Sequence, residues 1–215
     1  MKYSVKEIFY SLQGEGARTG RPAVFCRFSG CNLWSGLEAD RAAADCQFCD
    51  TEFRGTDGTG GGKFRTAEAL VMAVSAKWPK TGWRGSQRYV VCTGGEPLLQ
   101  LDDALIDAFH TRDFEVAVET NGTILAPSGL DWICVSPKAA VLLALRCGDE
   151  LKLVFPQVEP EAQPERFVDL DFRHFFLQPM DGPQRDANTR KALEYCLANP
   201  QWRLSLQTHK LLHIR

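Results

Sequence analysis

Three cysteines in the first quarter of the chain have the spacing of metal ligands. Cys31, Cys46 and Cys49 follow one another as C-x14-C-x2-C, and the close pair can place two thiolates on one metal centre without backbone strain. The four histidines lie far away in the sequence, so no local fourth ligand completes a closed zinc site. Three thiolates are the arrangement expected of a 4Fe-4S cluster that leaves one iron open to an exogenous ligand, as in an enzyme.

The other cysteines are expected to be ordinary small residues of the core or of loops: Cys92, Cys134, Cys147 and Cys196. Cys26 is ambiguous, because C-x4-C followed by C-x2-C resembles a plant-type ferredoxin spacing. Cys26 alternates with Val24 and Phe28 on one face of a predicted strand. We therefore interpret Cys26 as a core residue.

Six predicted strands are each followed by small and polar residues. These turns are Ser29 to Cys31, Thr93 to Pro97, Glu119 to Gly122, Ser136 to Lys138, Gln178 to Asp181 and Gln207 to Lys210. The carboxyl ends of parallel strands converge on one crevice, so the six turns are expected to line a single site. Any one of them taken alone is equally compatible with an ordinary turn.

Short apolar and aromatic segments predict the strands that position these turns. They are residues 5–11, 23–28, 89–92, 114–119, 132–135, 150–155, 174–177 and 203–206. Helical patterns follow Thr66 and Pro97, with Leu70, Val71 and Val74 on one face of the first and Leu98, Leu101, Leu105 and Ala108 on one face of the second. A third pattern opens at Asp186, and it is expected to bury Leu193, Cys196 and Leu197 and to end at Asn199-Pro200.

The alternation of strands and helices predicts an α/β fold with parallel strands and crossover helices. About six βα units are too few for a closed eight-fold barrel, so we expect a partial, open TIM-like barrel. One domain is expected over residues 1–215, with an insertion at 32–45 in the cysteine loop. The stretch 55–62 has five glycines in eight residues and is expected to be a flexible loop.

Composition excludes several classes of protein. The 25 Lys and Arg against 27 Asp and Glu give a net charge of −2, and nothing indicates a basic stripe for nucleic acid. The longest apolar run, 139–145, has seven residues, well short of the roughly 20 that cross a bilayer. Lys2, Lys6 and Glu7 leave no apolar signal core, so we expect a cytoplasmic protein with reduced thiols.

Taken together, the motifs resemble those of radical S-adenosylmethionine enzymes and, among these, the 7-carboxy-7-deazaguanine synthase family. The matching segments are Ser11 to Gly16, Phe25 to Phe28 leading into Gly30 to Leu33, Cys46 to Thr51, Thr93 to Pro97, Glu119 to Gly122, Ser136 to Lys138, Gln178 to Asp181 and Gln207 to Lys210. A Gly-Gly-Glu-Pro turn alone would mark only the superfamily, whereas this ordered set spans nearly the whole chain. One departure is the fourteen residues between the first two cysteines, where the superfamily usually has three.

The resemblance implies a lyase of queuosine and 7-deazapurine biosynthesis. The reaction would be a radical-mediated ring contraction of 6-carboxy-5,6,7,8-tetrahydropterin to 7-carboxy-7-deazaguanine with release of ammonia. It implies a 4Fe-4S cluster on Cys31, Cys46 and Cys49, S-adenosyl-L-methionine on its open iron, and Mg²⁺ bound through Thr51. It also implies an external low-potential electron donor of the flavodoxin or ferredoxin type, and a homodimer.

The resemblance also assigns roles to single residues. The pterin substrate would contact Leu12, Gln13, Gly14, Arg27 and Thr93, with the planar fork of Arg27 suited to its carboxylate. Glu15 and His209 are the acid/base candidates. Adenosylmethionine would contact Phe48, Gly95, Glu96, Ser136, Pro137, Lys138, Gln178, Pro179, Met180 and Asp181. The alternatives are that Glu96 only caps a helix, that Lys138 is a surface lysine and that Thr51 is a plain turn residue.

Two other classes of function remain open. A radical activase of a partner protein would share the cysteine triplet and the Gly-Gly-Glu-Pro turn, but it would not explain Arg27 together with the Gln13 to Gly16 turn. The third class is not an enzyme: a ferredoxin-like carrier with Cys26 as fourth ligand, or a zinc-stabilised module. Such a protein would need neither Arg27 nor the Gln13 to Gly16 turn. A 215-residue α/β chain is oversized for a carrier of one cluster.

Overall fold

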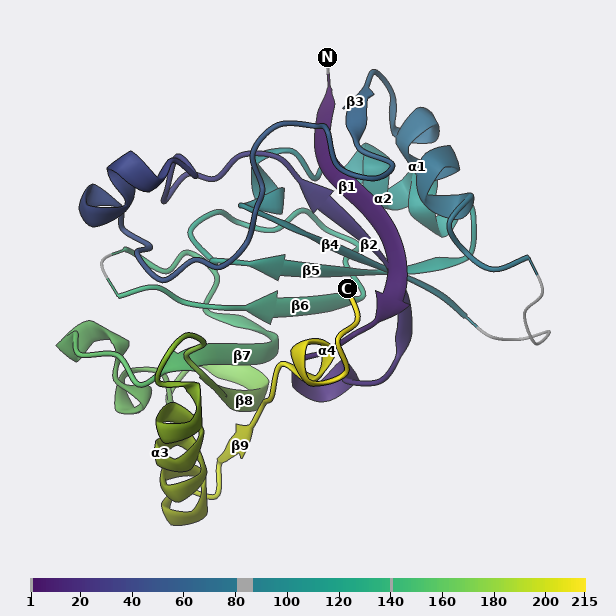
Figure 1. The fold of residues 1–215 in the computed structure, drawn as a ribbon. Coiled ribbons are helices and arrows are strands. Elements are labelled where there is room, and N and C mark those ends of the chain that lie inside the picture. Colours follow the sequence, from purple (N-terminus) through teal and green to yellow (C-terminus); the bar gives the residue numbers. More distant parts are fainter. Residues whose placement is uncertain (1, 81–86, 140) are drawn as a thin grey trace.

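The computed structural model describes residues 2–80, 87–139 and 141–215, and a nine-stranded open sheet is the framework of this part of the chain (Figure 1). The strands are β1 Tyr3–Leu12, β2 Pro22–Phe28, β3 Gly62–Phe64, β4 Arg88–Gly94, β5 Phe114–Thr120, β6 Trp132–Val135, β7 Cys147–Phe155, β8 Asp171–Pro179 and β9 Trp202–Leu204. Their order is β3-β1-β2-β4-β5-β6-β7-β8-β9. From β2 through β4 to β9 every neighbouring pair is parallel, while β1 pairs antiparallel with β2 and β3. The predicted open, mainly parallel α/β fold is confirmed.

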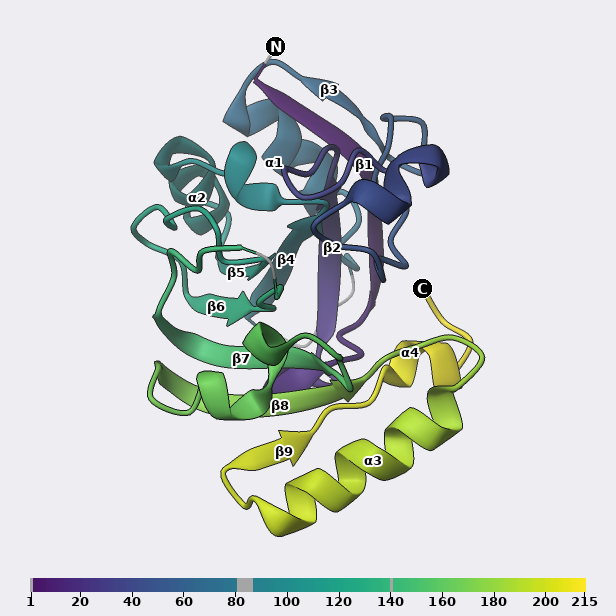
Figure 2. The same ribbon diagram turned by 90° about the vertical axis from the view of Figure 1, so that its left-hand side faces the viewer.

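Four α-helices occur in the described residues: α1 Ala67–Ser75, α2 Asp103–His110, α3 Arg185–Ala198 and α4 Thr208–Leu211. Figure 2 shows α1 and α2 near the β1 end of the sheet and α3 along β8 and β9 at the other end. The connections from β5 to β6 and from β7 to β8 contain no α-helix, nor do the described residues between β6 and β7. All eight predicted strands are present, and several of them are connected without an α-helix.

The first predicted helix forms with the expected apolar face, whereas the second is divided. The side chain of Thr66 accepts a hydrogen bond from the backbone N–H of Ala69 and so begins α1. The second pattern is interrupted: a 3-10 turn, Pro97–Leu99, is followed by a new start in which Asp102 caps α2. Because Asp102 begins a new helix inside the apolar pattern, the one predicted helix is divided into the 3-10 turn and α2.

The third helix buries a different face from the one predicted. Leu193 and Leu197 are 45% and 76% exposed, whereas Asn188 and Ala192 are buried and Cys196 is half-buried against the core. Asn188 and Ala192 lie four residues apart and therefore one above the other on the helix. The prediction of buried leucines is wrong because the contact with the sheet uses small and polar side chains.

The glycine-rich stretch predicted to be a flexible loop is hydrogen-bonded to β1. The backbone N–H of Gly58 donates to the carbonyl of Lys6 at 2.9 Å, and the N–H of Ile8 donates to the carbonyl of Thr59 at 2.9 Å. Gly62 then begins β3, which sequence patterns did not indicate. Because glycine has no side chain, the backbone of this stretch can lie close to the backbone of β1.

The core has two parts, one on each face of the sheet. The larger packs between the sheet and the helices, and the smaller comprises Phe9, Ala23, Phe25, Tyr89, Val91, Ala117, Trp132 and Cys134. Beside the smaller cluster, Arg18 and Arg21 both pair with Glu115 and lie 4.1 and 3.9 Å from the ring centroids of Trp132 and Tyr89. These side chains fill the space next to the smaller cluster. Among the described residues no helix is long and apolar enough to cross a membrane.

Candidate active site

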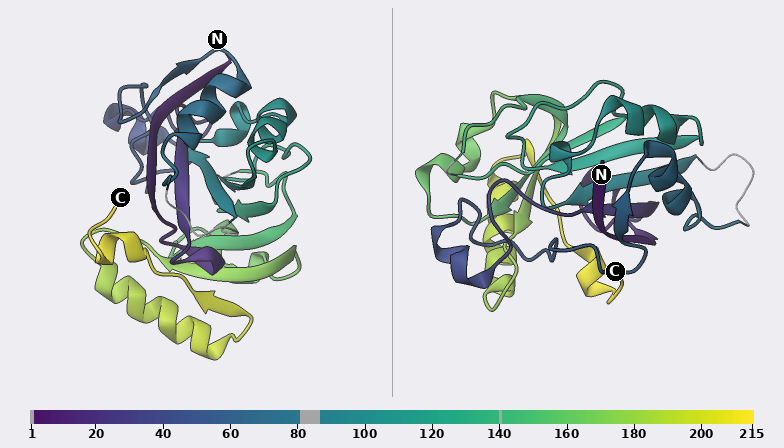
Figure 3. Two further views of the ribbon diagram at one scale, coloured as in Figure 1. Left: turned by 90° about the vertical axis from the view of Figure 1, so that its right-hand side faces the viewer. Right: turned by 90° about the horizontal axis from the view of Figure 1, so that it is seen from above.

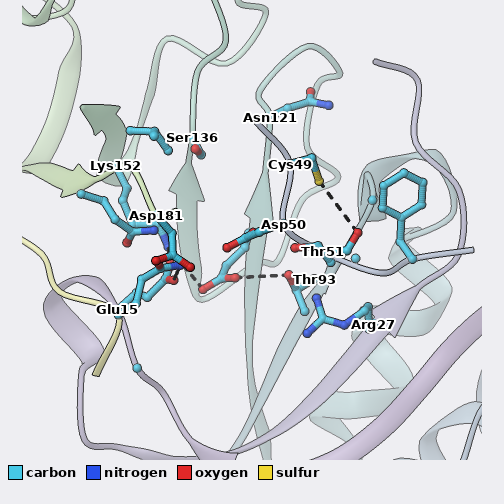
Figure 4. A pocket seen from close by; sticks show the side chains of 18 of the residues that line it. Glu15, Arg27, Cys49, Asp50, Thr51, Thr93, Asn121, Ser136, Lys152 and Asp181 are labelled. Carbon is cyan, nitrogen blue, oxygen red and sulfur yellow. Dashed lines mark hydrogen bonds and ion pairs between the residues drawn. The ribbon is translucent and has the colours of Figure 1, made fainter. Parts of the chain in front are cut away.

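A cavity of about 520 Å³ lies at the carboxyl ends of the parallel strands. Its walls contain every residue proposed above for the site except Glu96 and Pro137. Figure 4 shows the arrangement: Glu15 and Lys152 come from one side, and Arg27 and Thr93 come from the other. The six polar turns identified in the sequence thus converge, as parallel strand ends should.

The three cysteines of the C-x14-C-x2-C motif share one wall of this cavity. The neighbouring thiols of Cys46 and Cys49 shift each other, which lowers the pKa of Cys49 to about 6 and raises the pKa of Cys46. Burial raises the pKa of Cys31. No three His, Cys, Asp or Glu side chains in the described part of the chain are close enough to share a single ion. Three thiols are a donor set that suits an iron-sulfur cluster, which takes thiolate ligands.

Cys26 does not reach the cavity. It is fully buried in the larger core cluster, and burial holds the pKa of its thiol well above the usual range. A thiol in this environment is a small apolar side chain.

Lys138 faces the site and is not a surface lysine. Its Nζ donates to the backbone carbonyl and the hydroxyl of Ser136 at 2.7 and 2.8 Å, and it lies 5.7 Å from the ring centroid of Phe48. Burial lowers the pKa of Lys138. The ammonium is therefore held next to the cysteines, where it opposes their negative charge.

Glu96 lies behind the cavity wall and joins the ends of two strands. It is fully buried, and its carboxylate accepts hydrogen bonds from the N–H of Leu98 at 2.9 Å, the hydroxyl of Thr120 at 2.7 Å and the N–H of Asn121 at 2.8 Å. Burial raises its pKa, and these donors oppose that rise. The capping alternative for Glu96 matches this geometry.

Arg27 reaches the cavity from β2 but is already paired. Its Nε donates to Glu7 at 2.9 Å, and Glu7 also pairs with Arg215. The guanidinium plane is fixed by Glu7 through Nε, so the terminal nitrogens remain to meet an anion. Glu7 and Arg215 were not identified from the sequence, because their pairing joins positions 208 residues apart.

A buried lysine in the middle of β7 is the main site residue that sequence reasoning missed. Lys152 is 5% exposed, pairs with Glu15, and lies 3.7 Å from Glu119. Glu119 in turn accepts hydrogen bonds from Gln13 at 3.0 Å and from Thr93 at 3.2 Å. A charged residue within an apolar strand was the available signal, since lysine is almost never fully buried unless paired.

This network sets the charge of Glu15. Burial alone would raise the pKa of Glu15, but the charge and hydrogen bond of Lys152 outweigh burial and lower it to about 2. Burial likewise opposes the charge on Lys152, yet the surrounding carboxylates hold its pKa well above the usual range. Both groups are therefore ionised at neutral pH, and Glu15 is an acceptor rather than a proton donor.

The carboxyl-terminal residues complete the wall. His209 fills the space beside Gly14, whose carbonyl accepts from the N–H and hydroxyl of Thr208, both at 2.9 Å. Lys210 donates to Asp50 at 2.6 Å and to Asp181 at 2.5 Å. Lys210 thereby links the cysteine loop to the end of β8.

Comparisons with known proteins find relatives that match nearly the whole chain. No protein-family model matches the chain. It is 67% identical over 212 residues to a 7-carboxy-7-deazaguanine synthase of Caulobacter vibrioides, with 99% of each chain covered. A synthase of Bordetella pertussis with the same name is 62% identical, with all of both chains covered. The crystal structure of QueE from Escherichia coli superimposes with a TM-score of 0.68 at 30% identity, covering 95% of this chain and 93% of that one.

An open parallel sheet whose strand ends bring three cysteines and a Gly-Gly-Glu-Pro turn to one cavity is the architecture of a radical S-adenosylmethionine enzyme. The sequence identity of 67% and 62% to the two synthases, over nearly the whole chain, assigns it to one family within this class. The chain belongs to the 7-carboxy-7-deazaguanine synthase family.

Proposed function

We propose that the chain converts 6-carboxy-5,6,7,8-tetrahydropterin to 7-carboxy-7-deazaguanine with release of ammonia, in the biosynthesis of queuosine and other 7-deazapurines. The observation that carries this proposal is the 67% identity, over 99% of both chains, to a synthase of that name. The cavity supports it, because it combines thiols for a cluster with paired charges for a small anionic substrate.

Cys31, Cys46 and Cys49 would hold a 4Fe-4S cluster, and the open iron would bind S-adenosyl-L-methionine. When bound, these groups would supply the radical chemistry that removes a hydrogen atom from the substrate. Lys138 and Ser136 lie beside Phe48 and can bind the polar and aromatic parts of the nucleotide. Gly95 exposes its backbone there, and residues Gln178 to Asp181 border the same wall.

The substrate would lie between two groups of opposite character. On one side Arg27, oriented by Glu7, can bind the pterin carboxylate. On the other, Glu15 can accept hydrogen bonds from the N–H groups of the ring, since Lys152 keeps it ionised. Leu12, Gln13, Gly14 and Thr93 complete this wall, and His209 is the remaining candidate for moving a proton.

Thr51 is the proposed protein ligand of Mg²⁺. Its side chain lies on the cavity wall, whereas the neighbouring Asp50 is paired with Lys210. Mg²⁺ commonly takes few protein ligands and completes its octahedron with water and substrate oxygens. We expect EDTA to slow turnover and Thr51→Ala to weaken the response to added Mg²⁺; an unchanged rate in both would remove the ion from the site.

One experiment tests the function. The protein is reconstituted anaerobically with iron and sulfide, then given a strong reductant and adenosylmethionine, with and without carboxytetrahydropterin. Formation of deazaguanine product that is lost when Cys31, Cys46 or Cys49 is changed to Ala supports the proposal. Formation of 5′-deoxyadenosine with no pterin turnover would instead indicate the activase function.

The remaining proposals concern the whole chain. We propose one radical enzyme domain over residues 1–215, a cytoplasmic homodimer, and reduction of the cluster by a flavodoxin or ferredoxin. Sedimentation of the reconstituted protein and turnover with either donor in place of the chemical reductant test the last two.

A further inference from the structure

Residues 32–45, which separate the first two cysteines, form a folded segment rather than an open loop. A 3-10 helix spans Glu38–Ala43. Trp34 is 8% exposed, its indole N–H donates to the carbonyl of Leu37 at 3.1 Å, and its ring meets Phe53 edge to face at 5.7 Å. In Figure 1 this helix lies on the side to which the arrows of β5 and β6 point, and in Figure 3 (right) it stands clear of the sheet.

Arg41 connects this segment to the cysteine ligands. One terminal nitrogen of its guanidinium donates to the backbone carbonyls of Gln47 and Cys49 at 2.9 and 3.0 Å. Its Nε lies 2.9 Å from both carboxylate oxygens of Glu38, and its guanidinium carbon lies 4.1 Å from the ring centroid of Trp34. The guanidinium is therefore fixed on three sides.

A hydrogen bond in the opposite direction, from the ligand turn to the inserted segment, adds to the contacts of Arg41. The side-chain amide of Gln47 donates to the carbonyl of Ala42, in the same 3-10 helix, at 3.2 Å. Three hydrogen bonds thus cross between the inserted segment and the Cys46 to Cys49 turn. Two of them have an ionised donor, and such bonds are roughly twice as strong as neutral ones.

A long connection between ligands needs an anchor of this kind. The entropy lost when a loop is ordered grows with its length, so a fourteen-residue connection costs more to fix than a short one. Ordering the turn before the metal binds removes that cost from the binding step.

We propose that Arg41 is a positioning residue that holds the Cys46 to Cys49 turn in its ligand-binding shape before the cluster binds. The proposal rests on the proposed function only in assigning a cluster to these thiols. A lysine at this position keeps the charge but cannot reach both carbonyls and Glu38 at once, because it lacks the fork.

The test compares Arg41→Ala and Arg41→Lys with Asp40→Asn as the matched control. Asp40 belongs to the same 3-10 helix and accepts from the hydroxyl of Ser35 at 2.7 Å, and no bond from Asp40 to the ligand turn is present. In the metal-free chain, we expect amide hydrogen exchange over residues 46–51 to be roughly tenfold faster in Arg41→Ala. Arg41→Lys should fall between Arg41→Ala and the wild type, and Asp40→Asn should match the wild type.

A second readout uses the reconstituted protein. We expect iron to be lost to a chelator roughly tenfold faster from Arg41→Ala than from the wild type, and the paramagnetic resonance spectrum of the reduced cluster to broaden. Unchanged exchange over 46–51, or faster exchange spread over the whole sheet, would overturn the proposal. If the wild-type chain takes up no cluster, the proposed function fails, whereas exchange in the metal-free chain still decides the role of Arg41.

Discussion

At the scale of single residues, the carboxylates of the cavity depend on Lys152. This one ammonium pairs with Glu15 and lies 3.7 Å from Glu119. Removing one partner of a buried pair leaves an uncompensated charge. We expect Lys152→Met to abolish turnover and to lower the free energy of unfolding by about 3–5 kcal/mol in urea titrations.

A double variant separates the missing charge from a packing defect. In Lys152→Met with Glu15→Gln, one unpaired carboxylate is gone, so part of the lost stability should return. If the double variant is no more stable than Lys152→Met alone, the two side chains are not energetically coupled.

The low pKa of Glu15 predicts a particular pH dependence. Its pKa falls from 4.5 to about 2 on folding, which corresponds to about 3 kcal/mol. Because the folded-state pKa is the lower one, this stability is fully present above pH 4.5 and is lost as the pH falls toward 2. The unfolding free energies of wild type and Glu15→Gln should therefore differ by a constant amount from pH 5 to 8 and converge below pH 4.5. A difference that persists unchanged to pH 3 would contradict the assignment.

At the scale of elements, sequence patterns predicted most strands and only part of the helices. Short apolar runs identify β4 to β8 because parallel strands are buried on both faces. The three residues of β3 are too few to show a pattern, and α3 exposes Leu193 and Leu197 while burying Asn188, opposite to hydropathy. Lys152 was missed for a related reason: its partners come from β5 and from the turn after β1, so only the assembled sheet shows its role.

The turn after β4 requires glycine for a steric reason. A Cβ on Gly95 would overlap the carbonyl oxygen of Gly30, which accepts from the N–H of Glu96 at 2.9 Å. Separating these backbones should cost about 1–3 kcal/mol, as overpacking does. We expect Gly95→Ala to lower the melting temperature and weaken adenosylmethionine binding in calorimetry. Gly62→Ala is the matched control, because its Cβ would meet only the ring of Phe64, at 3.7 Å; equal effects in both variants would refute the steric argument.

At the scale of the whole molecule, the open sheet is closed at the cavity by residues from opposite ends of the chain. The N–H of Gly16 donates to the hydroxyl of Ser205 at 2.9 Å, and the N–H of Ala17 donates to Glu150 at 2.8 Å. Arg215 pairs with Glu7 and lies 4.8 Å from the ring centroid of Phe9. The turn after β1 and the residues after β9 thus form a wall where the sheet itself has a gap.

We expect that the carboxyl-terminal residues that close the cavity are not needed for the chain to fold. Residues 207–215 contribute nothing to the described core clusters, and Leu211 and Leu212 are 54% and 61% exposed. Yet His209 and Lys210 line the cavity. We expect a chain ending at residue 206 to keep its circular dichroism spectrum and cooperative unfolding while turnover is lost and hydrogen exchange at residues 13–17 quickens. A truncated chain that unfolds without cooperativity would assign these residues to the fold, and one with unchanged KM and kcat would show that substrate does not need this wall.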